Sequence, residues 1–171
     1  MKFSSASILG AFSAASPELD IIVDVLRQVQ QQVDNLGAVH AENGPAVAPM
    51  VDAFLRVVST ITSGIDTISR LDKLKFASSL LLASPVSELK EHTQVLSEHL
   101  LGAKPRIAAQ GNTDVVYKQV VRTREATQSL ISIIIDKVPS KAQGIARYQA
   151  QGIIDILQGL QETFLPDQQV L

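Results

Sequence analysis

The sequence contains no cysteine and no tryptophan, and only 4% of its 171 residues are aromatic. The absence of cysteine excludes disulfides, thiol catalysis, iron–sulfur clusters and zinc sites built on cysteine. Neither sign of charge dominates, since 15 basic and 17 acidic residues give a formal net charge of −2. The chain therefore lacks the excess of basic residues that is typical of proteins that bind nucleic acid or anionic lipid.

Long apolar runs are also missing, because none reaches the roughly 18 residues that a membrane-spanning helix needs. With 46% hydrophobic residues, a chain of this length can still bury a substantial core as one domain. Residues 1–15 differ from the rest. A basic start at Lys2, a weakly apolar stretch and Ser13-Ala14-Ala15 are typical of a secretory signal peptide. Residues 1–15 are thus predicted to be a signal peptide or a disordered terminus, and residues 16–171 the domain.

Apolar residues recur with a helical period from Pro17 onward, and turn residues divide this pattern into five predicted helices. Ser16 caps the first helix, which Asn43-Gly44-Pro45 ends. The second covers residues 46–71. The spacing of Asp52 and Arg56, and of Asp66 and Arg70, suits exposed ion pairs on its outer face.

The third helical region begins near Leu74, where Pro85 either starts a new helix or kinks a continuous one. A turn with a ready N-cap at residues 110–114 precedes the fourth helix, and Pro139-Ser140 separates it from the fifth, which Pro166 ends. The predicted fold class is all-α, a single-domain five-helix bundle with an apolar central pocket.

Motifs for catalysis and metal binding are not found. The nucleophile elbow, phosphate-binding loops and the dinucleotide-binding turn are absent, which argues against an enzyme. The three histidines, His40, His92 and His99, do not form the Glu-x-x-His pairs of a ferritin-like site. We therefore expect no metal and no cofactor, and histidines at the margin of a partly solvated face.

A few polar residues interrupt the apolar faces. Thr123 and Thr127 lie on the inward stripe of the fourth helix, Gln149 on that of the fifth, and Thr93 on that of the third. A buried threonine hydroxyl usually bonds the carbonyl one turn earlier, which is the structural alternative to a ligand contact. A buried amide needs several partners, so Gln149 is harder to explain in this way.

Small residues also face inward, among them Ala142, Ala146 and Ala150 on the last helix, with Gly64 on the second and Gly102-Ala103 on the third. Two outcomes remain open from periodicity alone. Either the helices approach closely and the gap vanishes, or the gap remains and an apolar ligand fills it.

A slot walled by aliphatic side chains, with a few hydroxyl and amide groups, suits a fatty acyl chain and its carboxyl end. No lysine faces inward and Arg124 lies only at the edge of a stripe, so neutral hydrogen bonds are expected to recognise the head group. The candidate ligand-binding residues are Phe54, Val58, Ile61, Ile65, Leu89, Thr93, Leu96, Leu100, Val120, Thr123, Thr127, Ile131, Gln149, Ile153 and Leu157.

Several spaced residues add a family resemblance. Ala83-Ser84-Pro85-Val86 with Leu89, then Lys104, Gly111 and Asp136-Lys137-Val138-Pro139, precede an Ala/Gly/Ile-rich helix that ends at Phe164. The pattern resembles the fungal hydrophobic surface-binding protein A family, which includes cell-wall galactomannoproteins. The resemblance implies a secreted or cell-wall five-helix bundle that binds fatty acids such as palmitate or arachidonate. It implies no catalysis, and pathogen members of the family sequester host lipid mediators as virulence-associated proteins.

Three functions follow as hypotheses. The first is a carrier or scavenger of long-chain fatty acids, acting as a monomer or homodimer. The second is an adaptor that coats hydrophobic surfaces and recruits a secreted esterase. The third is a helical interaction protein whose grooves accept partner helices. The chain stops soon after the last helix without an anchor signal, which favours a freely secreted form.

Overall fold

The computed structural model describes residues 16–41 and 47–166. Five long helices and one short helix make up the described fold: α2 (Pro17–Ala41), α3 (Val47–Ser69), α4 (Phe76–Leu80), α5 (Ala83–Ala109), α6 (Thr113–Lys137) and α7 (Ser140–Thr163). The predicted five-helix bundle is confirmed, with α4 as an addition. Residues 1–15 and the predicted stop at Asn43-Gly44-Pro45 lie outside the described residues.

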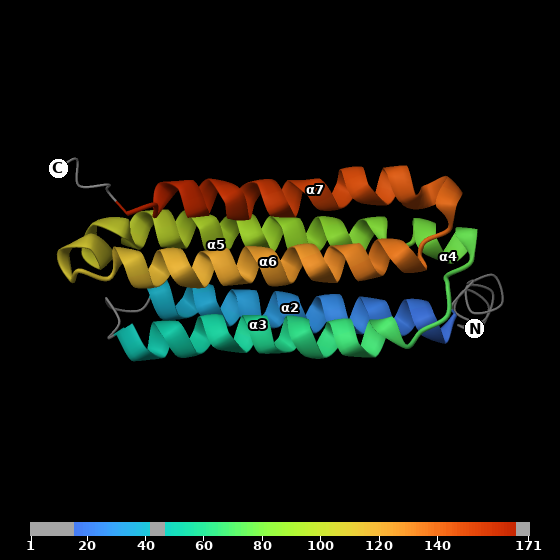
Figure 1. The fold of residues 1–171 in the computed structure, drawn as a ribbon, viewed down its shortest axis with the longest axis horizontal. Helices are drawn as coiled ribbons and strands as arrows, with labels where there is room; N and C mark the ends of the chain where they lie inside the picture. Colours follow the sequence, from blue (N-terminus) through green and yellow to red (C-terminus); the bar gives the residue numbers. More distant parts are fainter. Residues whose placement is uncertain (1–15, 42–46, 167–171) are drawn as a thin grey trace, which may run out of the picture.

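The five long helices form a closed ring around one apolar core (Figure 1). Each packs along two neighbours, in the order α2, α3, α6, α7, α5 and back to α2. α5 and α6 touch each other only slightly, and α7 lies over both, on the side away from α2 and α3. α7 therefore closes the ring by bridging two helices that barely touch.

The helix ends follow the sequence in most places. Ser16 Oγ accepts a hydrogen bond of 3.2 Å from the backbone N–H of Leu19, which confirms the predicted cap of α2. Gly111 adopts a φ of 71° in the turn between α5 and α6, a conformation that favours glycine. The predicted N-cap of α6 is wrong. Asn112 has a ψ of 8° and makes no capping bond, because a capping side chain needs a more extended backbone to reach the first turn.

Pro85 lies in the first turn of a new helix and does not kink a continuous one. The chain makes the short helix α4, turns at Leu81 and Leu82, and begins α5 at Ala83. Proline is tolerated there because the first N–H groups of a helix have no partner inside the helix. Leu74, where a helix was expected to begin, lies in the linker and is buried.

The apolar stripes form the core as the helical period predicts. On α2, for example, the stripe is at most 5% exposed and comprises Ile22, Leu26, Val29, Val33 and Leu36. Gly102 is the exception, since it is exposed and faces away from the neighbouring helices.

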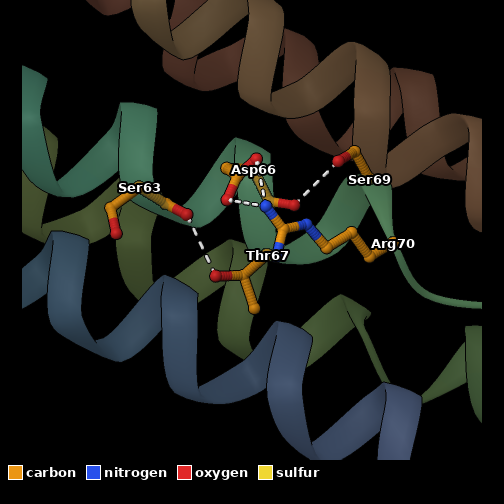
Figure 2. Close-up of polar contacts among 5 residues, drawn as sticks. All are labelled: Ser63, Asp66, Thr67, Ser69 and Arg70. Atoms are coloured by element: carbon orange, nitrogen blue, oxygen red, sulfur yellow. Dashed lines mark hydrogen bonds and ion pairs between the residues drawn. The ribbon is translucent and has the colours of Figure 1, made fainter.

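The outer face of α3 carries one of the two predicted ion pairs. Arg70 Nη2 lies 2.9 Å from Asp66 Oδ2, and Figure 2 shows this pair beside the hydroxyl-to-backbone bonds of Thr67 and Ser69. Asp52 and Arg56 form no ion pair in the part of the chain that the structure describes. Exposed pairs gain little energy in water, so the same spacing does not always bring the charges together.

Candidate functional site

Two small cavities lie next to each other inside the ring. The larger has a volume of about 30 Å³ and the smaller about 20 Å³. Leu89, Thr127 and Ile153 line both cavities, so the two follow one another through the core. The remaining lining of the larger cavity is Leu26, Leu82, Val86, Leu130, Ile131, Ile134, Ile135, Ala146, Gln149 and Ala150.

These volumes show how much space remains beside the small inward residues, where either close packing or a gap for an apolar ligand was expected. Pockets for small organic ligands have volumes of roughly 300–1,000 Å³. The larger cavity, at about 30 Å³, is an order of magnitude below that range. The predicted apolar central pocket is thus present only as two small cavities, and the ring would have to widen to admit an acyl chain.

Most of the candidate ligand-binding residues line one or both cavities: Ile61, Leu89, Thr93, Leu96, Thr123, Thr127, Ile131, Gln149, Ile153 and Leu157. The others do not line these two cavities. Phe54, Leu100 and Val120 are fully packed core residues, and Val58 and Ile65 are only half-buried. The structure therefore gathers the candidates on α5, α6 and α7 more than those on α3.

The three buried threonines use their hydroxyls within their own helices. The Oγ1 of Thr93 donates to Leu89 O at 2.7 Å, that of Thr123 to Gln119 O at 2.8 Å, and that of Thr127 to Thr123 O at 2.7 Å. Each hydroxyl has one hydrogen to give, so these side chains have no donor left for a carboxylate. Their structural role, the alternative stated above, is confirmed.

Gln149 is the polar residue that remains available at the larger cavity. It is half-buried on α7, and its amide forms no hydrogen bond with any of the described residues. Helical spacing identified this residue correctly as an irregularity. It did not identify Lys90, which lies one position beyond the buried Leu89 and reaches across to α7.

His40 is a buried base at the far end of α2, where the prediction of a partly solvated histidine is wrong. The residue is 1% exposed, and its ring meets Phe54 edge-on with centroids 6.1 Å apart. Burial is the main cause that lowers the pKa of His40 to about 4, and the nearby charges of Arg106 and His99 contribute to the same shift. The signal was present in the sequence, because His40 follows Leu36 by four residues on the same stripe.

A polar contact between α2 and α5 involves His92. Its Nδ1 lies 2.6 Å from Asp34 Oδ1, and its Nε2 lies 3.1 Å from Gln30 Nε2. Across residues 16–41 and 47–166, no group of three or more His, Asp or Glu side chains is arranged to hold a metal ion. None of the described helices is long and apolar enough to cross a membrane.

Comparison with known families identifies the chain. The family described as hydrophobic surface binding protein A matches residues 19–136. The chain belongs to this family. The family match covers α2 to α6 and most of the core described above, and it confirms the resemblance seen in the sequence.

Two curated relatives are both named cell wall mannoprotein 1. The one from Aspergillus fumigatus is 30% identical over 146 residues, which are 85% of this chain and 50% of that protein. The one from Aspergillus flavus is 26% identical over 165 residues, or 92% of this chain and 60% of that protein. The chain thus spans half to three fifths of the length of these relatives.

Solved structures share the fold of this family member. Ligand binding domain 1 of Penicillium marneffei MP1 protein, complexed with arachidonic acids, has a TM-score of 0.82 at 18% identity and covers 87% of this chain and 99% of that one. Afmp4p in complex with palmitic acid has a TM-score of 0.78 at 15% identity and covers 85% of this chain and 99% of that one.

Proposed function

We propose that this chain is a secreted, cell-wall-associated binding domain without catalytic activity, which takes a long-chain fatty acid into the interior of its ring. The observation that carries the proposal is the pair of adjoining apolar cavities beneath a helix with small inward residues. Support comes from the family, from relatives named as cell wall mannoproteins, and from similar folds solved with arachidonic or palmitic acid.

Uptake requires a helix that can move, and α7 fits this role. Its inward residues near the larger cavity include Ala146 and Ala150, which give up few contacts when the helix shifts outward. No hydrogen bond of the described residues joins α5 to α7, whereas polar contacts of His92 and Arg106 hold α5 to α2. We infer that α7 separates from α5 and that the acyl chain occupies the space between them.

Apolar burial supplies the affinity. Each methylene transferred from water contributes about 0.8 kcal/mol, so a palmitate-length tail gains roughly 11 kcal/mol before the cost of opening the ring. The cost of opening is lower where cavities already exist, because fewer contacts are lost there. A tail that enters along the two cavities displaces the least packed part of the core.

Native mass spectrometry of protein purified under mild conditions tests the proposal. We expect bound fatty acid on the folded chain, and displacement of a fluorescent fatty acid by added palmitate or arachidonate. Protein that carries no lipid and does not bind the fluorescent probe would contradict the proposal.

One feature favours adsorption to hydrophobic surfaces as a second function. Around α4 and the first turns of α7, which pack against each other, large apolar side chains are 47–84% exposed: Phe76, Leu80, Leu81, Ile145 and Tyr148. Replacing Phe76, Leu80 and Leu81 together by serine should reduce retention on hydrophobic beads and leave fatty-acid binding intact. Equal retention of the triple variant would contradict this role. Recruitment of an esterase and the oligomeric state stay predictions.

A further inference from the structure

A groove follows the outside of the seam between α5 and α7, next to the larger cavity. Its volume is about 700 Å³, and its lining includes Ser87 and Lys90 from α5 with Tyr148, Gln149 and Gly152 from α7. Gln149 lines both this groove and the apolar cavity. Its amide therefore lies at the boundary between the interior of the ring and the solvent.

Lys90 is the cation at this boundary. Its side chain crosses Gly152 so closely that a Cβ at residue 152 would lie 2.6 Å from Lys90 Cε and 3.0 Å from Nζ. The missing side chain at Gly152 thus allows Lys90 to lie against α7. Lys90 forms no ion pair with a carboxylate of the described residues. Asp155 also lines the groove, where its Oδ1 accepts a hydrogen bond of 2.9 Å from Gln151.

We propose that Lys90 and Gln149 hold the carboxylate of the bound fatty acid at the seam between α5 and α7, with the tail directed inward along the two cavities. An ionised carboxylate is costly to bury, so it remains at the rim, where an ammonium and an amide N–H can both donate to it. The inference rests on the proposed function. It adds that the site selects a free acid over an alcohol or ester of equal length.

Other polar groups near the cavities are less suited to this role. The hydroxyls of Thr123 and Thr127 already donate to backbone carbonyls. On the opposite side of α7, Arg147 lines a groove against α6, but the residues shared by that groove and the cavity are apolar: Ile131, Ile135 and Ala150. Among the described residues, Gln149 at the seam with α5 is the one polar side chain that lines both an interior cavity and a groove with a cation.

Charge selectivity provides the first test, with palmitate and hexadecanol as probes. We expect Lys90→Gln to weaken palmitate binding about fivefold, which is the range of a partly exposed ion pair, and to leave hexadecanol binding within about twofold. Lys90→Arg should retain most of the palmitate affinity. Arg147→Gln is the matched control, because it removes the same charge from the other side of α7.

The outcomes separate the two proposals. If the unaltered protein binds palmitate and Lys90→Gln binds it equally well, the assignment of the head group is overturned and the fatty-acid function stands. An equal loss in Arg147→Gln also overturns the assignment, because the effect would then be one of net charge. If the unaltered protein binds neither probe, the proposed function itself fails.

Gly152→Ala tests the geometry without removing a charge. The added methyl group displaces the flexible end of Lys90, while alanine raises the helix propensity of α7, so the variant should fold and be at least as stable. We expect palmitate binding to weaken about threefold, in the direction of Lys90→Gln. Gly144→Ala and Gly159→Ala are controls, because a Cβ there meets nothing within 4 Å. Equal affinities in all three alanine variants would contradict the placement of Lys90.

Discussion

The two sides of the ring use small residues in opposite ways. Between α2 and α3, a Cβ on Gly64 would lie 2.4 Å from Val25 Cγ1, so the glycine lets two helices meet without a gap. On α7, Ala146 and Ala150 instead line the larger cavity. A small inward residue therefore closes a gap only where the facing helix places a side chain directly over it.

The residues that face each small residue explain the difference. α3 packs along α2 and α6, and α7 packs along α5 and α6 in the same way (Figure 1). Val25 lies directly over Gly64, whereas the space next to Ala146 and Ala150 is left open as the larger cavity. Residues of α7 line both cavities, and the smaller cavity also reaches Val29 and Val33 of α2 and Val57 and Ile61 of α3.

The largest expected effect comes from His40, which lies at the end of α2 and meets Phe54 of α3. Its pKa is about 4 in the folded chain against 6.5 for an ordinary histidine, so between these pH values the unfolded chain binds a proton that the folded chain does not. Stability should fall as the pH is lowered through 6.5 and level off near 4, by up to about 3 kcal/mol. Urea unfolding at pH 7 and pH 4.5 measures this loss.

His40→Leu is the comparison for this measurement. The leucine variant keeps the carboxylates that also titrate in acid, so the difference between the two pH profiles isolates the histidine. We expect the variant to lose less stability than the unaltered protein between pH 7 and pH 4.5. Parallel profiles would contradict the buried, neutral state of His40.

A smaller loss is expected where α2 and α3 meet. Gly64→Ala should destabilise the fold by about 2 kcal/mol through overpacking against Val25, although alanine favours a helix. Adding Val25→Ala should recover part of the loss, and Gly159→Ala should be neutral or stabilising. Chemical denaturation of the four proteins measures these differences. A stabilising Gly64→Ala would show that the two sides are not packed differently.

The smallest effect is expected on the cavity side. Ala150→Val adds two methyl groups at the larger cavity, so it should stabilise the free protein by about 0.5–1 kcal/mol, after the lower helix propensity of valine. The same variant should weaken palmitate binding by about tenfold, because the methyl groups occupy space that the tail would take. Thermal unfolding and probe displacement report the two effects. A clear loss of stability would mean that the cavity has no room.

The fold was predictable to the extent that it depends on local pattern. The five long helices follow from a 3.6-residue period and from turn residues such as Gly111, and the stripe from Ile22 to Leu36 is buried as that period requires. The choice at Pro85 was not predictable, because a proline suits both a first turn and a kink. The tertiary position of the buried linker around Leu74 decides between them.

The candidate site was predictable only in part. Periodicity identified Gln149 as an irregularity, because a polar residue on an apolar stripe is visible within one helix. Periodicity did not identify Lys90, because its proposed role depends on Gly152, which lies opposite it on a helix far along the chain. Periodicity could not predict the size of the cavities either, because the space inside the ring depends on how all five long helices pack.

The position of α7 in the chain has a consequence for folding. Among the described helices it is made last, and the ring cannot close without it. Without α7, core residues of the other long helices would face solvent, and exposed apolar surface of this kind is prone to aggregation. A chain cut after Lys137 should therefore expose these core residues. Folding is expected to become cooperative only when α7 is present.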